Sequence, residues 1–385
     1  MTKSTLSTAL TILLILIGAF FQQAHGAEGQ PILIASIFAH TGKAAEENSP
    51  NYLMTRLAAK KINEQGGILG RPIKLIEIDN KSTAIGSHQA ALQAIKAGVV
   101  AVVGPSWSSH AMNMAPVLQQ AKIPMIGATT TAPEVTQVGD YIFRACYTNQ
   151  YQAKVLAQFA IKNLHAARAA MMVIAGDVYS EDLAKQFEAE FKKAGGLISA
   201  KELYILSSMD FEKQLIAIRE SKPDIVFVPG FARDSGLILK QARNMGFSVP
   251  FLGGDGWTAL EQYPHIQNLS GANYYVSHWH HGNTSPASKQ FIEYIRKELG
   301  PNAMQGIDAG NPIAYDALSL VADAIRRAQS TDPEAIRDAL SKTTDFQGVT
   351  GSITFDGSRD PQKTLVILSI SGKTVTYEQA FTPQQ

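Results

Sequence analysis

The sequence predicts an α/β protein with two similar lobes. Short apolar runs that suit buried parallel strands alternate with amphipathic segments of helical length from residue 31 onward. The alternation forms two series, one ending near residue 144 and the other beginning near residue 149. A chain of 385 residues is also long enough to bury two hydrophobic cores. We therefore expect two mostly parallel sheets, each flanked by helices, with a cleft between the lobes.

The first series combines β-branched apolar runs with clear helix-ending signals. Gly66 and Gly67 end its first long helix, because glycine readily adopts the left-handed conformation that terminates helices. Ser108 or Ser109 is the expected N-cap of a helix that ends before Lys122. The other predicted segments are strand 32–38, helix 51–65, strand 73–78, helix 86–97, and strands 99–103, 125–127 and 141–144.

The second series repeats the pattern and then returns through further helices and strands. The predicted helices are 151–164, 181–194, 211–220, 235–244, 286–299, 311–327 and 333–341. The predicted strands are 169–174, 201–206, 224–228, 251–252, 272–276, 353–354, 365–370 and 374–377. No Pro/Gly/Ser-rich linker interrupts the sequence, so we expect short hinges rather than a flexible tether between the lobes.

Composition and the N-terminal residues define the class of protein. Charged residues make up 17% of the chain and the net charge is +1, which gives no electrostatic signature of nucleic-acid or membrane-surface binding. Residues 1–26 have the pattern of a secretory signal peptide: Lys3, an apolar run over 10–21, and the small-x-small site Ala24-His25-Gly26. The single cysteine, Cys146, allows no intramolecular disulfide and lies far from the expected cleavage site, so we expect no lipid anchor.

Two hydroxyl-rich turns follow neighbouring predicted strands. The strand 99–103 is followed by residues 104–109 (GPSWSS), and the strand 125–127 by residues 129–134 (TTTAPE). The carboxyl ends of parallel strands meet at the sheet edge where open α/β folds bind ligands, and a helix start lined by serines suits a small anion such as a carboxylate. These hydroxyls are therefore interpreted as ligand contacts, or alternatively as helix caps alone.

At these turns the chain resembles the branched-chain amino-acid-binding proteins, the type I periplasmic solute-binding proteins of ABC importers. Further matches are residues 66–71 (GGILGR), Asp79 and residues 236–246 (GLILKQARNMG). The resemblance covers essentially the whole chain after residue 26. It implies a two-lobed type I periplasmic binding protein fold that crosses between lobes near residues 146, 278 and 358. The expected N-terminal lobe is 27–146 plus 279–358, and the expected C-terminal lobe is 147–278 plus 359–385.

The resemblance also implies a set of ligand-binding residues. Ser108 and Thr131 match positions that bind the carboxylate and amino group of the ligand, and Thr129 matches a backbone contact. Asp255 matches the acid that receives the ammonium, and Tyr179 matches a tyrosine that contributes its hydroxyl. Each has an ordinary alternative: Asp255 before a glycine suits a turn, and Tyr179 suits packing at a helix start.

The side-chain end of the expected pocket is less determined by sequence. Phe231 stands where relatives often carry an aromatic residue, and Trp107 flanks the expected cleft. Glu46 and Glu47 lie near an aromatic or apolar contact of the aliphatic-specific relatives. Glu47 is either a solvated charge in a first helical turn or a carboxylate that favours a polar or cationic ligand side chain.

The histidine-rich run 278–281 (HWHH) raises the possibility of a metal site, but no cysteine or acidic residue lies at a typical ligand spacing. We expect neither a metal ion nor a cofactor. Residues 104–108 resemble a Gly-x-Ser-x-Gly nucleophile motif but lack its last glycine, so no catalytic residue is predicted.

The predicted function is capture of a small solute, most simply an amino acid, by hinge closure and its delivery to an inner-membrane ABC permease. The expected protein is a periplasmic monomer that is not an enzyme and does not bind nucleic acid. The alternatives are a binding protein for a small aromatic or aliphatic carboxylic acid or amide, and a soluble sensor for a membrane receptor, because the fold is shared with receptor ectodomains.

Overall fold

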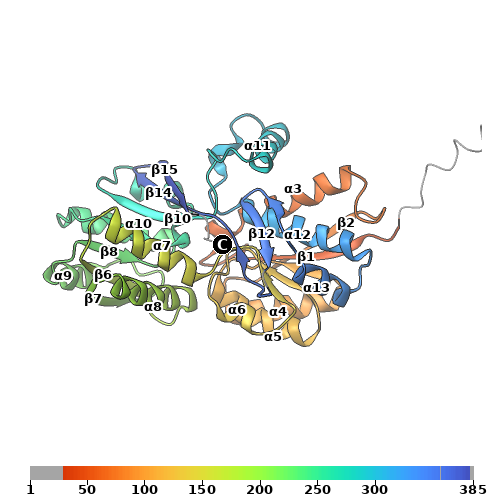
Figure 1. Cartoon of the computed structure of the whole chain (residues 1–385), viewed down its shortest axis with the longest axis horizontal. Helices are drawn as coiled ribbons and strands as arrows, with labels where there is room; N and C mark the ends of the chain where they lie inside the picture. Colours follow the sequence, from red (N-terminus) through yellow and green to blue (C-terminus); the bar gives the residue numbers. More distant parts are fainter. Residues whose placement is uncertain (1–28, 356, 382–385) are drawn as a thin grey trace, which may run out of the picture.

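A five-stranded parallel sheet forms the first lobe (Figure 1). Its strands, in the order β2-β1-β3-β4-β5, are β1 (Ile32–Phe38), β2 (Ile73–Asp79), β3 (Ala101–Val103), β4 (Met125–Gly127) and β5 (Ile142–Arg144). The computed structural model describes residues 29–355 and 357–381, so the predicted signal peptide lies outside the described residues.

Helices cover both faces of this sheet, as the alternation along β1 shows. Ile34 and Phe38 of β1 belong to the core under α3 and α12, whereas Ala35 and Ile37 belong to the core under α4 and α5. The helices of this lobe are α2 (Ala45–Asn48), α3 (Pro50–Glu64), α4 (Ala84–Lys96), α5 (Ser108–Gln120), α6 (Glu134–Gln137), α11 (Pro286–Leu299), α12 (Pro312–Ala328) and α13 (Pro333–Ser341). Two-sided burial explains why β3, β4 and β5 read as continuous apolar runs.

A seven-stranded mixed sheet forms the second lobe, in the order β15-β14-β10-β9-β8-β6-β7. Its strands are β6 (Arg168–Ile174), β7 (Leu197–Tyr204), β8 (Ile225–Val228), β9 (Phe251–Gly253), β10 (Asn273–Ser277), β14 (Leu365–Ser371) and β15 (Thr374–Phe381). The β10–β14 and β14–β15 pairs are antiparallel and the other pairs are parallel. Its helices are α7 (Asn149–Lys162), α8 (Val178–Lys193), α9 (Glu212–Glu220) and α10 (Ala232–Asn244).

Short elements complete the fold. Four 3₁₀ turns occur among the described residues: η1 (Asp255–Trp257), η2 (Leu260–Gln262), η3 (Pro264–Ile266) and η4 (Ala303–Gly306). A small antiparallel sheet contains β11 (Phe346–Gly348), β12 (Gly351–Phe355) and β13 (Pro361–Gln362). The structure thus confirms the predicted α/β class with two mostly parallel sheets. Within residues 29–355 and 357–381, every helix is too short or too polar to cross a membrane.

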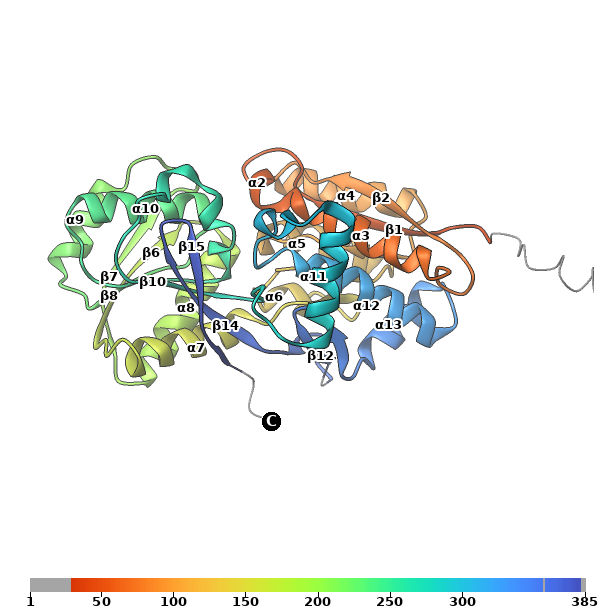
Figure 2. The ribbon, with the colours of Figure 1, turned by 90° about the horizontal axis from the view of Figure 1, so that it is seen from above.

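The chain passes between the two sheets at three points. It leaves the first sheet after β5. After β10 it returns to the helices that cover the first sheet, and it enters the second sheet again at β14 (Figure 2). At the last crossing, Asp360 pairs with Arg144 at 2.7 Å and the Lys363 ammonium donates to the Ala145 carbonyl at 3.1 Å. Residues up to 363 therefore contact the first lobe, and we propose a third crossing near residue 364 in place of the boundary expected at residue 358.

Candidate functional site

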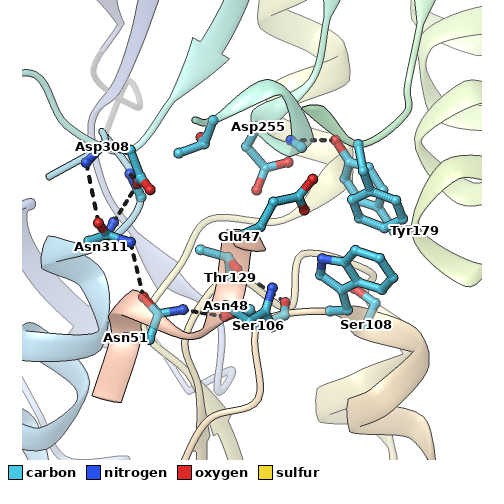
Figure 3. Close-up of a pocket in the computed structure, with 15 residues that line it drawn as sticks. Glu47, Asn48, Asn51, Ser106, Ser108, Thr129, Tyr179, Asp255, Asp308 and Asn311 are labelled. Carbon is cyan, nitrogen blue, oxygen red and sulfur yellow. Dashed lines mark hydrogen bonds between the residues drawn. The ribbon is translucent and has the colours of Figure 1, made fainter. Parts of the chain in front are cut away.

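A pocket lies between the two lobes, at the carboxyl ends of strands from both sheets (Figure 3). Its cavity volume is about 60 Å³. Since a single water molecule needs only about 10–15 Å³ on this measure, the cavity has room for a small solute. It is lined by Glu47, Asn48, Asn51, Ser106, Trp107, Ser108, Thr129, Tyr179, Phe231, Asp255, Gly256, Thr258, Asp308, Gly310 and Asn311.

The two hydroxyl-rich turns of the first lobe form one wall of the pocket. The Ser108 hydroxyl accepts a hydrogen bond from the Ala132 N–H at 3.2 Å, and the Thr129 hydroxyl donates to the Ser106 carbonyl at 3.1 Å. These bonds tie the turn after β3 to the turn after β4, so the structure brings both turns together as predicted. The prediction that Ser108 or Ser109 caps α5 is wrong: Trp107 is the N-cap, and Ser108 is the first helical residue with its hydroxyl bonded to the neighbouring turn.

Thr131 is the one predicted contact that does not line the cavity. It is fully buried, and its carbonyl accepts a hydrogen bond from the Asn149 N–H at the start of α7, at 2.8 Å. Its hydroxyl has no hydrogen-bond partner among the described residues. In this arrangement Thr131 therefore supports the wall from behind, and its contact with a ligand stays a prediction.

Asp255 lies in the second lobe, directly after β9, and its carboxylate faces the pocket (Figure 3). One carboxylate oxygen accepts from the Gln152 side-chain amide at 3.1 Å, and the other is 3.0 Å from Nε2 of His278. Gln152 also accepts from the Asp255 main-chain N–H at 3.2 Å. Both oxygens are thus held by partners in or next to the second lobe, which fixes the orientation of the carboxylate before any ligand binds.

His278 therefore acts as a partner of Asp255. Its ring is fully buried and stacks on Tyr147 with 4.1 Å between ring centroids. Burial lowers the pKa of His278 despite the adjacent carboxylate, so the neutral imidazole donates through Nε2. Across residues 29–355 and 357–381, no group of three or more His, Cys, Asp and Glu side chains is placed to hold a metal ion.

Aromatic rings meet across the cleft on the side of the pocket nearest α5 and α8. Trp107 of the first lobe stacks on Phe231 of the second, with 3.8 Å between centroids and 11° between planes. Tyr179 stacks on the same Phe231 at 5.4 Å, and its hydroxyl accepts a hydrogen bond from the Gly256 N–H at 2.9 Å. Burial raises the pKa of the Tyr179 phenol well above its usual value, so this group remains a neutral donor. The rings hold the two lobes in a closed arrangement.

Glu47 lines the cavity although it belongs to the short helix α2, at the edge of the first lobe that faces the second (Figure 2). Its carboxylate accepts hydrogen bonds from the Trp107 indole and from the main-chain N–H of Arg233, at the start of α10. The interpretation of Glu47 as a solvated helix charge is therefore wrong. Glu46, its neighbour, is exposed and outside this cavity.

Comparison with known proteins identifies the family. Residues 31–371 match the family model described as periplasmic binding protein. The chain belongs to the periplasmic binding protein family. It is 27% identical over 362 residues to the Leu/Ile/Val-binding protein BraC3 of Rhizobium johnstonii, covering 94% of this chain and 95% of that protein. It is 25% identical to the Leu/Ile/Val-binding protein of Escherichia coli K12 over 86% of this chain and 88% of the relative.

Solved structures of this family share the fold. The substrate-binding protein LivJ from Streptococcus pneumoniae, in complex with isoleucine, has a TM-score of 0.85 and 27% identity over 92% of this chain and 100% of that chain. The leucine-binding protein LivK from Thermotoga maritima has a TM-score of 0.84 and 29% identity over 91% and 99%. The resemblance and the two-lobed fold predicted from the sequence are confirmed. The protein is a solute-binding protein and not an enzyme.

Several residues of this binding protein's pocket were not predicted from the sequence. They are Asn48, Asn51, Ser106, Thr258, Asp308 and Asn311. Asn51 donates to the Ser106 hydroxyl at 2.9 Å and accepts from the Asn311 amide at 3.4 Å, so one hydrogen-bonded chain joins α3, the turn after β3 and the start of α12. Ser106 stood in a turn already singled out. Asn48 ends α2, Asn51 lies in the first turn of α3 and Asn311 precedes α12, and these positions gave no separate signal.

Proposed function

We propose that this protein captures a small L-α-amino acid in the interlobe pocket and delivers it to the permease of an ABC importer. The observation that supports the proposal is that two walls of the pocket carry different chemical groups. A carboxylate, Asp255, is fixed on one side by Gln152 and His278. Hydroxyl groups at the start of α5, including that of Ser108, lie on the other. An ammonium and a carboxylate on one carbon atom match these walls.

The proposed contacts follow from charge. The α-ammonium binds Asp255, since an opposite charge and hydrogen bonds offset the cost of burying the carboxylate. The α-carboxylate binds the Ser108 and Thr129 turn, where hydroxyls and the positive end of the α5 dipole favour an anion. Tyr179 contributes its hydroxyl from the second lobe. The names of the relatives, which bind leucine, isoleucine and valine, support an amino acid as the ligand.

Closure of the two lobes would enclose the solute. Trp107 and Phe231 come from different lobes, so their stacking forms when the cleft closes and separates when it opens. The proposed lobes are residues 27–146 with 279–363, and 147–278 with 364–385. Residues 1–26 are proposed to direct export to the periplasm and to be removed there, and the mature protein is proposed to act as a monomer.

Thermal unfolding of ligand-stripped protein tests the head-group assignment. A ligand at a hundred times its dissociation constant stabilises a protein by about 2.7 kcal/mol, a rise in Tm of roughly three or four degrees at this chain length. Each amino acid is tested beside its des-amino acid and its decarboxylated amine, for example L-leucine, isocaproic acid and isoamylamine. We expect shifts with the amino acids alone. Shifts with the acids alone would overturn the role of Asp255 and favour a carboxylic-acid ligand.

A further inference from the structure

The wall of the pocket carries three carboxylates. Glu47, Asp255 and Asp308 all contribute to its wall, and the described lining residues include no lysine or arginine. Under the proposed function the α-ammonium of the ligand compensates Asp255. Glu47 and Asp308 then remain without a counter-charge. Buried carboxylates without a cationic partner cost free energy, so a ligand that supplies the missing positive charge would be favoured.

Glu47 is held in place by neutral donors only. Its carboxylate accepts from the Trp107 indole and from the Arg233 main-chain N–H. The Arg233 guanidinium donates to Asp234 instead, at 2.6 Å. Burial, with a smaller contribution from the negative charges of Asp234 and Asp308, raises the pKa of Glu47 to about 8. The Glu47 carboxylate thus has one partner in each lobe, Trp107 and Arg233, but no cationic side chain among the described lining residues neutralises it.

Asp308 reaches the same cavity from the loop before α12. One of its carboxylate oxygens accepts from the Gly310 and Asn311 N–H groups, at 2.7 Å and 2.9 Å. Burial raises its pKa to about 6. Thr258 also lines the cavity, and its hydroxyl has no hydrogen-bond partner among the described residues. Carboxylates and a free hydroxyl together form a set of acceptors that a donor-rich cation would satisfy.

We infer that the ligand is a basic amino acid, whose second protonated nitrogen supplies the positive charge that the Glu47 and Asp308 carboxylates lack in this pocket. This inference rests on the proposed function, because the first nitrogen and the carboxylate must occupy the Asp255 and Ser108 walls. A neutral aliphatic side chain would leave both carboxylates desolvated without compensation. A guanidinium or ammonium group supplies the counter-charge and donates to their oxygens.

Matched ligand pairs test the inference on the unmodified protein. L-arginine is compared with L-citrulline, which has a neutral ureido group of the same shape, and L-ornithine with L-norvaline. Calorimetric titration of ligand-stripped protein is expected to give at least a tenfold lower Kd for the basic member, about 1.4 kcal/mol. Equal affinity within the pairs, or tighter binding of L-leucine than of L-arginine, would overturn the inference.

Two glutamine variants test whether the preference for a basic ligand depends on Glu47. Glu47→Gln keeps the size of the side chain and removes its charge, and Glu46→Gln is the matched control one residue earlier, outside the cavity. The arginine-to-citrulline affinity ratio is expected to fall about tenfold in Glu47→Gln and to stay unchanged in Glu46→Gln. This ratio is taken within one variant, so a general loss of folding does not alter it. An unchanged ratio in Glu47→Gln would overturn the assignment.

These outcomes distinguish failure of the basic side-chain inference from failure of the proposed function. Binding of L-leucine and L-citrulline with no preference for L-arginine leaves the proposed function standing and overturns only the basic side chain. If no amino acid binds, the proposed function fails, and the inference fails with it.

Discussion

The two ends of the pocket are built differently. The head-group end uses residues in or just after the turns that follow strands: Ser108 begins α5 after the turn that follows β3, Thr129 lies in the turn after β4, and Asp255 lies shortly after β9. The two further carboxylates of the pocket come from elements that are far apart in sequence: Glu47 belongs to the short helix α2, and Asp308 to the loop before α12. The first construction is a property of the fold, because strand ends always meet at one sheet edge. The second depends on how α2 and the loop before α12 pack in the folded protein.

The partners of the carboxylates differ in the same way. Asp255 is paired with His278 and Gln152, so it is satisfied before the ligand arrives. Glu47 is bonded only by the neutral Trp107 and Arg233 N–H donors, and its pKa is raised to about 8 by burial. A carboxylate that already has hydrogen-bond partners, such as Asp255, suits the α-ammonium that every amino acid carries. A carboxylate without a cationic partner, such as Glu47, suits a charged group that only some ligands carry. The following experiments test this division.

The largest effect is expected from Asp255→Asn. Loss of the charge that receives the α-ammonium should weaken the binding of every amino acid by about thirtyfold or more, because the cost of breaking a buried charge pair is about 2–5 kcal/mol. The loss should be similar for L-arginine and L-leucine, as measured by calorimetric titration. Glu46→Gln serves as the control for removal of a nearby exposed charge. A loss confined to L-arginine would place Asp255 at the side-chain end instead.

The pH dependence of binding tests the other acid. A carboxyl whose pKa is raised to about 8 in the ligand-free closed form keeps its proton at pH 7, and a bound cation lowers that pKa and releases the proton. By linkage, affinity for L-arginine should rise with pH up to about 8, by at most about tenfold per unit, and then level off. Citrulline should show no such rise. Affinity for L-arginine that falls over this range would contradict the prediction.

The groups that face Glu47 limit the useful pH window. Burial raises the pKa of Asp308 to about 6, so its titration affects affinity mainly below pH 7; burial also raises the pKa of Asp234. Burial raises the pKa values of Tyr204 and Tyr263, which keeps both phenols neutral throughout. The interval from pH 7 to pH 8 therefore reports on Glu47, and the slope there should disappear in Glu47→Gln.

A smaller and uniform effect is expected from Phe231→Ala. The variant removes the ring that stacks on Trp107 across the cleft, and such aromatic pairs contribute about 0.5–1.5 kcal/mol beyond their buried area. Affinity should fall roughly fivefold for basic and neutral amino acids alike, with faster dissociation in stopped-flow measurements. Phe187→Ala, in the core of the second lobe, would lower stability without this uniform loss of affinity. An effect on L-arginine alone would make Phe231 a specificity residue.

The same division explains what the sequence could predict. Apolar runs followed by hydroxyl-rich turns located Ser108 and Thr129 correctly, because strand ends and sheet edges follow from local pattern. Local pattern left Glu47 open between a solvated helix charge and a pocket carboxylate, because its partners Trp107 and Arg233 lie far along the chain. Asp308 and Thr258 likewise become pocket residues only when the lobes come together. The Thr131 prediction followed the family motif; Thr131 does not line this cavity, and its contact with a ligand stays a prediction.

The smallest effect is expected from Thr258→Val. Valine keeps the shape of threonine and removes a hydroxyl that has no partner among the described residues. The ligand-free protein should gain about 0.5–1 kcal/mol of stability in urea unfolding, because an unsatisfied buried hydroxyl is no longer desolvated. Affinity for L-arginine should fall about twofold if this hydroxyl accepts from the bound cation, while affinity for L-norvaline should be unchanged. Equal losses for both ligands would assign Thr258 to the head-group end, and the division between the two ends would have to be redrawn.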